Sequence, residues 1–281
     1  MKRSIKLWAV LFALVSLCLV FASCDSGSSD SDDPTPPPVP TVALPEGALA
    51  GEFSVGANKQ VHFSKGNLWY GKVGSATTAT FNFEDNQYSF AGSWDANHVS
   101  HFRWAAKSGI LADDVASAIS TETSLSGGTS DVFFTNATTE SANVDFTVNG
   151  VTGKYRTLSK DEWLYLFNTR TVNGNTGAGY SYSLNITYGG KMGVVLYPDD
   201  YTGSVLSGSV TNLPEGVVFL PAAGFRDGSD VYVVGSGGGY WSATPVGSGY
   251  AFFLYFDSSN ALMDDRYRYY GFSVRLVVDE N

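Results

Sequence analysis

Apolar residues from position 46 onward occur in short runs rich in valine, phenylalanine and tyrosine, separated by glycine, aspartate, serine and asparagine. Runs of this kind, bounded by turn-forming residues, predict β-strands joined by tight turns. Within residues 250–256 we expect Ala251, Leu254 and Phe256 to lie in the core. The expected strands cover residues 53–55, 61–63, 67–70, 193–197, 217–222, 232–234, 240–243, 250–256 and 273–278.

One segment has helical periodicity instead. Ser159 is followed three residues later by Glu162, which is the spacing of a capping box, and Trp163, Leu166 and Phe167 fall on one apolar face. Residues 112–119 favour a second, short helix. Mixed short strands with about two helices predict an α+β fold, and the length from residue 46 to residue 281 predicts a single domain.

The amino-terminal residues have the pattern of a lipoprotein signal peptide. A basic start is followed by the apolar residues 7–21, a run too short to span a bilayer comfortably, and small residues precede Cys24. We therefore expect residues 1–23 to be a cleaved signal and Cys24 to be acylated, which anchors the chain in the membrane through lipid. A signal cleaved to release a soluble protein and an uncleaved anchor are the alternatives.

Residues 24–45 follow as a tether. The stretch 25–33 is rich in serine and aspartate, and proline recurs between residues 34 and 40, so this segment has little to bury and favours an extended, solvated chain. The acidic residues directly after Cys24 resemble the surface-export signals of Bacteroidetes lipoproteins. This resemblance implies an outer membrane lipoprotein that is exposed on the cell surface.

Charge and cysteine content restrict the function further. The chain has a formal net charge of -10, and loss of Lys2, Arg3 and Lys6 with the signal makes it three units more negative. Such a surface repels nucleic acid, so we expect no nucleic-acid partner. Cys18 lies in the signal and Cys24 would be acylated, so the domain is expected to have no cysteine nucleophile, disulfide or cysteine-ligated metal.

The last sixty or so residues place aromatic and small polar residues between apolar strands, a composition typical of binding surfaces. We expect loops at residues 244–249 and 264–269 to face a protein or glycan ligand. The alternative is that these are ordinary solvated residues, with tyrosines covering the edge of the core. The predicted ligand-facing residues are Thr244, Pro245, Val246, Tyr255, Asp257, Asp264, Asp265, Tyr267 and Arg268.

Four strings carry a family resemblance: YRTLSKDEWLYLFNTR at 155–170, FLPAAGFRDG at 219–228, GGYWSAT at 238–244 and YGFSVRLV at 270–277. They resemble surface lipoproteins of the Bacteroides and Fibrobacter major paralogous domain family, which are similar to the formylglycine-generating-enzyme branch of C-type-lectin-like proteins. The resemblance implies a C-type-lectin-like fold. It also implies carboxy-terminal loops that a diversity-generating retroelement can vary.

Enzyme chemistry finds little support, so we expect a binding protein. The oxidase chemistry of formylglycine-generating enzymes needs a cysteine pair, which the domain lacks. Zinc hydrolysis lacks a ligand motif, and His98 and His101 are expected to be a surface pair. No cofactor is assigned, although calcium could bind carboxylate pairs. The candidate pairs are Asp264 with Asp265 and Asp199 with Asp200.

Three further expectations concern structure. Arg226 and Arg275 are expected to be structural, with Arg275 paired to a buried carboxylate or carbonyl, and the glycine-rich residues 235–239 are expected to form a connecting loop. An envelope or fimbrial subunit is the first functional alternative, and an unpaired edge strand would favour it. A glycan-active enzyme using Asp161, Glu162 and Asp264 is the second.

Overall fold

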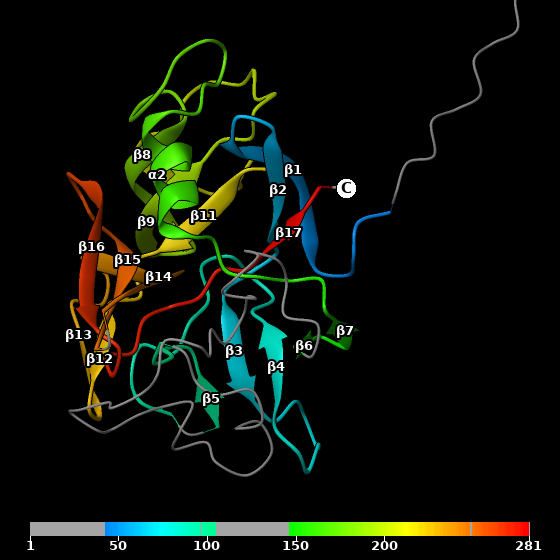
Figure 1. Cartoon of the computed structure of the whole chain (residues 1–281), viewed down its shortest axis with the longest axis vertical. Helices are drawn as coiled ribbons and strands as arrows, with labels where there is room; N and C mark the ends of the chain where they lie inside the picture. The colour runs from blue at the N-terminus through cyan, green and yellow to red at the C-terminus, as the bar shows by residue number, and fades with distance from the viewer. Residues whose placement is uncertain (1–42, 96, 105–145, 248, 281) are drawn as a thin grey trace, which may run out of the picture. The chain divides into compact units, whose positions relative to one another are not determined.

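The computed structural model describes residues 43–95, 97–104, 146–247 and 249–280 (Figure 1). These residues belong to one compact unit, Val42–Asn281. The expected signal at 1–23, Cys24, most of the tether at 24–45 and the expected helix at 112–119 lie outside the described residues and stay predictions. Among the described residues, no helix combines the length and the apolar character needed to cross a membrane.

The described chain is predominantly β, with 47% of residues in strands and 5% in helix. α2 (Lys160–Asn168) is the one helix in these ranges. The expected α+β, C-type-lectin-like fold with about two helices is therefore wrong. Among the described residues, only the segment that begins at Ser159 combines a capping box with an apolar face, whereas the other apolar runs there are short and pair as strands.

Six small sheets organise the described residues, and the strands in each are antiparallel except for a parallel β10–β8 pair. The three-stranded sheet β1-β2-β17 and the four-stranded sheet β10-β8-β9-β11 have the following bounds: β1 (Ala48–Gly56), β2 (Lys59–Ser64), β17 (Val277–Asp279), β10 (Ser209–Val210), β8 (Tyr182–Tyr188), β9 (Lys191–Leu196) and β11 (Val218–Pro221). Figure 1 shows the red β17 beside the blue β2.

The remaining four sheets are β14-β15-β16, β4-β3-β5 and the two hairpins β12-β13 and β6-β7. Their bounds are β14 (Gly237–Val246), β15 (Tyr250–Asp257), β16 (Ala261–Tyr267), β4 (Thr80–Phe83), β3 (Leu68–Gly71), β5 (His98–Val99), β12 (Phe225–Asp227), β13 (Asp230–Tyr232), β6 (Thr147–Val148) and β7 (Val151–Thr152). Most of the expected strands overlap an observed strand by three residues or more. The expected strand at 273–278 overlaps β17 by two residues, and of the stretch 232–234 only Tyr232 lies in a strand.

Helix α2 forms where its sequence predicts it. The side chain of Ser159 accepts a hydrogen bond from the Glu162 amide at 3.2 Å, and the Glu162 carboxylate accepts one from the Ser159 amide at 2.7 Å. Trp163, Leu166 and Phe167 are buried on the face predicted to be apolar. The helix contacts β1 and the sheet β14-β15-β16, so its packing links the start of the domain to its carboxy-terminal sheet (Figure 1).

Strand β15 is buried on both faces. Ala251 and Phe253 belong to one core cluster, whereas Leu254 and Phe256 belong to a second cluster that includes the apolar face of α2. Alternate residues of a strand point to opposite faces, so burial on both sides requires a nearly continuous apolar run. This explains the composition of β15 and confirms Ala251, Leu254 and Phe256 as core residues.

The glycine-rich segment is not a connecting loop throughout, because Gly237, Gly238 and Gly239 begin strand β14. A Cβ atom at Gly238 would lie 2.3 Å from the ring of Phe256, and one at Gly239 would lie 2.1 Å from the ring of Phe272. These glycines let aromatic rings pack directly against the strand backbone. The expected loop at 235–239 is therefore wrong for its last three residues.

The two arginines expected to be structural are buried. Arg275 is 0% exposed, and its guanidinium donates to the side-chain oxygens of Gln87 at 2.7 Å and Asn67 at 3.4 Å and to the Phe219 carbonyl at 3.4 Å. Burial lowers the pKa of Arg275 to about 10. Arg226 donates to the Gly228 carbonyl at 2.5 Å. Carbonyl oxygens thus hold both side chains inside the domain, as predicted.

Candidate ligand-binding surface

The residues predicted to face a ligand lie on the sheet β14-β15-β16, but mostly in strands and not in loops. Thr244, Pro245 and Val246 form the end of β14, and the segment from Asp264 to Tyr267 belongs to β16. The expected loops at 244–249 and 264–269 are therefore wrong at residues 244–246 and 264–267, which are strand. Their polar residues had indicated loops, but a strand at the edge of a sheet can present polar side chains to solvent.

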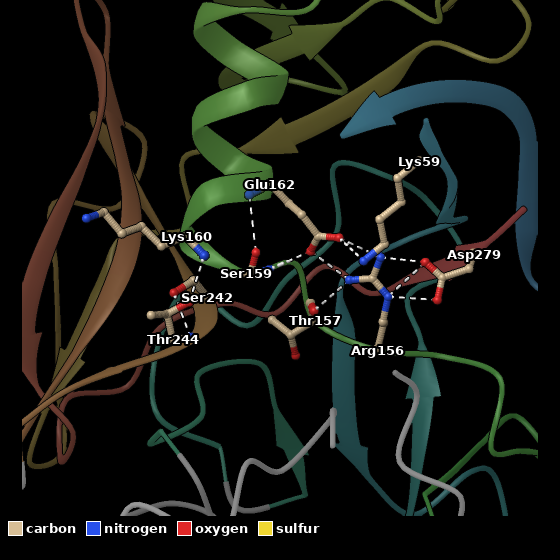
Figure 2. Close-up of polar contacts among 9 residues, drawn as sticks. All are labelled: Lys59, Arg156, Thr157, Ser159, Lys160, Glu162, Ser242, Thr244 and Asp279. Atoms are coloured by element: carbon tan, nitrogen blue, oxygen red, sulfur yellow. Dashed lines mark hydrogen bonds and ion pairs between the residues drawn. The ribbon is translucent and has the colours of Figure 1, made fainter. Parts of the chain in front are cut away.

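Thr244 contacts helix α2. Its hydroxyl accepts a hydrogen bond from the backbone amide of Lys160 at 2.9 Å, within the first turn of the helix (Figure 2). The first amides of a helix have no partner inside the helix, so this bond satisfies a group that would otherwise need water. The structure therefore accounts for Thr244 without a ligand.

Arg268 is buried and also has a structural role. Its Nε donates to the Tyr250 carbonyl at 2.9 Å, its Nη2 donates to the Gly247 carbonyl at 2.7 Å, and its guanidinium lies 4.4 Å from the centre of the Trp104 ring. With 3% of the residue exposed, it offers almost no surface to a partner. The prediction that Arg268 faces a ligand is not supported by this position.

Asp257 closes the turn between β15 and β16. Its carboxylate accepts hydrogen bonds from the amides of Ser259 at 2.7 Å and Asn260 at 2.8 Å. These bonds, led by the one from Ser259, lower the pKa of Asp257. Tyr255 is half-buried on the same strand and packs against the core. Both residues are near the surface, but their contacts are those of a turn and of a core edge.

Asp264 and Asp265 are consecutive in β16, so their side chains point to opposite faces of the strand. Asp264 forms an ion pair with Arg266 at 3.0 Å, and its Oδ1 accepts from the amide of Asp265 at 2.8 Å. In the ranges that the structure describes, neither residue belongs to a group of three potential metal ligands. In the other expected calcium pair, Asp199 with Asp200, the carboxylate of Asp199 already accepts hydrogen bonds from Ser54 and Arg170.

Tyr267 belongs to a chain of ring contacts that we call the tyrosine row, formed by Tyr250, Tyr267, Tyr269 and Tyr270. The ring centres are separated by 4.2 Å between Tyr250 and Tyr267, 5.2 Å between Tyr267 and Tyr269, and 4.8 Å between Tyr269 and Tyr270. Tyr267 is 43% exposed and the other three are half-buried. Desolvation raises the pKa of Tyr269 to about 12, so its hydroxyl remains a hydrogen-bond donor at neutral pH.

The tyrosine row extends the predicted surface in both directions. Val246 pairs with Tyr250 and Pro245 pairs with Ala251 across the hairpin, so these two predicted residues lie beside the row. At the other end, Tyr270 contacts Phe225, which stacks on the exposed Tyr232 with 5.5 Å between ring centres. Sequence reasoning missed Tyr250, Tyr269 and Tyr270, although the tyrosine-rich string at 267–270 was a signal for them.

A polar pocket elsewhere was missed by sequence reasoning. His98 Nε2 lies 2.6 Å from the buried carboxylate of Glu84, and the ring of His98 stacks on Trp69 with 4.3 Å between centres. The hydrogen bond that His98 donates to the Glu84 carboxylate raises the pKa of His98. Lys191 lines the same pocket. His101 is buried and bonds the Ala223 carbonyl, so the expected surface pair of His98 and His101 is wrong.

Residues 207–277 match a family model described as a domain of unknown function, DUF8237. The matched segment includes all of the sheet β14-β15-β16, both hairpin turns and the tyrosine row. No curated protein and no solved structure matches the chain. The match therefore marks the carboxy-terminal region as a recurring unit and describes no activity for it.

Proposed function

We propose that this chain is a cell-surface lipoprotein that binds a protein or glycan ligand through the sheet β14-β15-β16, with the tyrosine row as the main contact. Tyrosines offer apolar ring surface and a hydroxyl at little cost in side-chain entropy, which makes them effective contact residues. The observation that carries the proposal is the continuous series of ring contacts from Tyr250 to Tyr270 at the surface.

The charged residues beside the tyrosine row support recognition of a polar partner. Asp265 is half-buried opposite Phe252 in the hairpin, and the exposed Arg266 follows it. A carboxylate and a guanidinium next to aromatic rings can supply directional hydrogen bonds to a ligand. Of the residues predicted from the sequence, Pro245, Val246, Asp265 and Tyr267 fit this surface best, whereas Thr244 and Arg268 have structural partners.

The sequence supports the cellular setting of this proposal. The basic start, the apolar run and Cys24 favour an acylated anchor in the outer membrane, and the tether at 24–45 would hold the domain away from the bilayer. We also infer kinship with the major paralogous domain lipoproteins and diversification by a retroelement. A near-copy of the DNA encoding residues 240–275, differing mainly at adenines, beside a reverse transcriptase gene would support diversification, and its absence would oppose it.

Binding to glycan and peptide arrays tests the proposal. We compare the full chain with a variant carrying Tyr267→Ala and Tyr269→Ala, and with Tyr180→Ala, which removes a tyrosine that is 53% exposed outside the sheet. Hot-spot residues of interfaces are enriched in tyrosine and cost about 2 kcal/mol or more when truncated, which is more than tenfold in affinity, so we expect a loss of that size only in the double variant. Equal binding by all three proteins, or binding to neither array, would reject the tyrosine row as the ligand surface.

The structural-subunit alternative draws on one observation. Within the described ranges β16 pairs only with β15, so it is an edge strand that could accept a strand from another chain. However, Asp264, Asp265 and Arg266 lie in its centre, and charges on an edge strand oppose strand addition. We therefore favour ligand binding over polymerisation. Concentration-dependent filaments of the purified chain would reverse this preference.

A further inference from the structure

Three potential metal ligands gather on one face of the sheet β1-β2-β17, away from the tyrosine row. Glu52 of β1 and Val278 of β17 both pair with His62 of β2. Glu280 follows Val278 by two residues and so shares its face of the sheet. One ring nitrogen of His62 and one carboxylate oxygen of each glutamate lie within 4.8 Å of one another.

The ring of His62 is held in a fixed orientation. Its Nδ1 lies 3.1 Å from the Gly51 carbonyl, and 4% of the residue is exposed. A carbonyl oxygen can only accept, so Nδ1 carries the proton and Nε2 of the neutral ring retains its lone pair. In metal sites, a ligating histidine commonly donates its other ring N–H to a backbone carbonyl in this way.

The backbones of Glu52 and Glu280 are fixed by hydrogen bonds, but their carboxylates are not. The amide of Asp199 donates to the Glu52 carbonyl at 2.9 Å, and the amide of Glu280 donates to the Gln60 carbonyl at 3.0 Å. Among the described residues, neither glutamate side chain has a hydrogen bond or an ion pair. The strands therefore position two like charges beside a buried imidazole, and no ion pair within the described ranges balances them.

We propose that Glu52, His62 and Glu280 form a site for a divalent transition metal of the zinc class. One imidazole nitrogen and two carboxylate oxygens are ligands that this class accepts, and the two carboxylates balance the charge of the ion. Calcium fits less well because it takes oxygen ligands. Bonds of about 2 Å need ligands somewhat closer together than they lie here, and the exposed glutamate side chains can close that gap by changing rotamer.

The site goes beyond the proposed binding function, because it lies on strands that the tyrosine row does not use. A bound ion would join β1, β2 and β17 through one residue on or directly after each strand. Any ligand that binds only the folded chain stabilises it, so the ion would raise the melting temperature. Three protein ligands also leave a coordination position open for water or for a group from a partner.

Zinc titration of the untagged full chain by calorimetry tests the site. Exposed glutamates can be replaced without disturbing the core, so we compare Glu52→Gln and Glu280→Gln with Glu215→Gln, which changes an exposed glutamate elsewhere. We expect one ion per chain in the unmodified protein and in the control. Changes in the surroundings of a bound metal typically cost 10–100-fold in affinity, so loss of one ligand should weaken binding at least about tenfold.

Nuclear magnetic resonance gives a second readout that does not depend on affinity. The chain has three histidines, so zinc should shift the Nε2 resonance of His62 and leave the ring nitrogens of His98 and His101 unchanged. A shift at His98 instead, full-strength binding by the variant carrying both Glu52→Gln and Glu280→Gln, or absence of zinc binding by the unmodified chain would each overturn the proposal.

Discussion

Arg156 and Glu162 meet through two parallel hydrogen bonds, from Nη1 to Oε2 at 2.7 Å and from Nη2 to Oε1 at 2.8 Å (Figure 2). The same carboxylate accepts from Lys59 at 2.7 Å and from the Ser159 amide, so it caps helix α2 and balances a buried guanidinium. Burial opposes the charge on Glu162, but the hydrogen bonds and charge of Arg156, together with the bonds from Lys59 and the Ser159 amide, outweigh it and lower the pKa of the carboxyl. Arg156 also holds Asp279 of β17.

Replacement of Glu162 by glutamine should destabilise the domain. The amide can retain the bond to Ser159, but it leaves the buried Arg156 with Asp279 as its remaining anionic partner. Loss of one partner of a buried ion pair costs about 3 kcal/mol in the free energy of unfolding. Urea denaturation measures the loss. The control Asp161→Asn removes an exposed acid from the same helical turn and should cost about 0.5 kcal/mol; equal effects would contradict the role assigned to Glu162.

Thr244→Ala should lower stability but leave ligand binding intact, because the hydroxyl bonds the Lys160 amide. Loss of a side-chain cap on a helix amide costs about 1 kcal/mol. Thr244→Ser keeps the hydroxyl and is the matched variant. Denaturation curves and the array experiment together decide the matter: if Thr244→Ala abolished binding while leaving the unfolding free energy unchanged, the threonine would be a ligand contact after all.

Arg268→Lys should also destabilise the domain. Lysine cannot reproduce the fork that reaches the carbonyls of Tyr250 and Gly247, nor the contact of the guanidinium with the Trp104 ring. We expect a loss of about 2 kcal/mol, measured by thermal unfolding. Arg266→Lys, at an exposed position in the adjacent strand, should change stability by less than about 0.5 kcal/mol. A smaller effect at Arg268 than at Arg266 would refute the structural role.

His101 should make the domain less stable in mild acid. Burial lowers the pKa of His101 from 6.5 to about 4. Between pH 6.5 and pH 4 the imidazole is therefore protonated in the unfolded chain but neutral in the folded chain. Stability contributed by this residue is present above pH 6.5 and is lost as the pH falls toward 4, by up to about 3 kcal/mol. Chemical denaturation across this range measures it. A ring that titrates near 6.5 in the folded protein would contradict the prediction.

His98 should behave in the opposite sense. The hydrogen bond to Glu84 raises the pKa of His98 above 6.5, so the stability that His98 contributes is present below pH 6.5 and is lost as the pH rises through the raised value. Glu84→Gln removes the charge of the partner and should lower the pKa of His98 toward 6.5. Resonances of the three histidines can be followed in one titration, with His101 as the internal reference. An unchanged pKa in that variant would contradict the pairing.

Local features of the sequence predicted the local structure well. The capping box at Ser159 and Glu162 correctly located α2, and the apolar run at 250–256 correctly located β15. These features depend on neighbouring residues, so spacing and composition are sufficient to find them. The fold class was wrong because it depends on how distant strands pair, which no local pattern reports.

The predicted site stays a prediction, but the structure shows which of its residues are exposed. Composition drew attention to the carboxy-terminal segment, and Tyr267 in that segment is exposed. It could not show that Arg268, the next residue, points inward to carbonyls about twenty residues earlier in the chain. Nor could it predict that Glu52, His62 and Glu280 meet, because three strands from both ends of the domain bring them together.

The pairing of β17 with β2 has a kinetic consequence. Val277 pairs with Phe63, so almost the entire domain separates two neighbouring strands. Closing so large a loop is entropically costly, and contacts between remote segments slow folding. A nascent chain has no closing strand for this sheet until residues 277–279 have been synthesised. The sheet β1-β2-β17 therefore cannot be completed before then, and a chain truncated before residue 277 should collapse without reaching its native state.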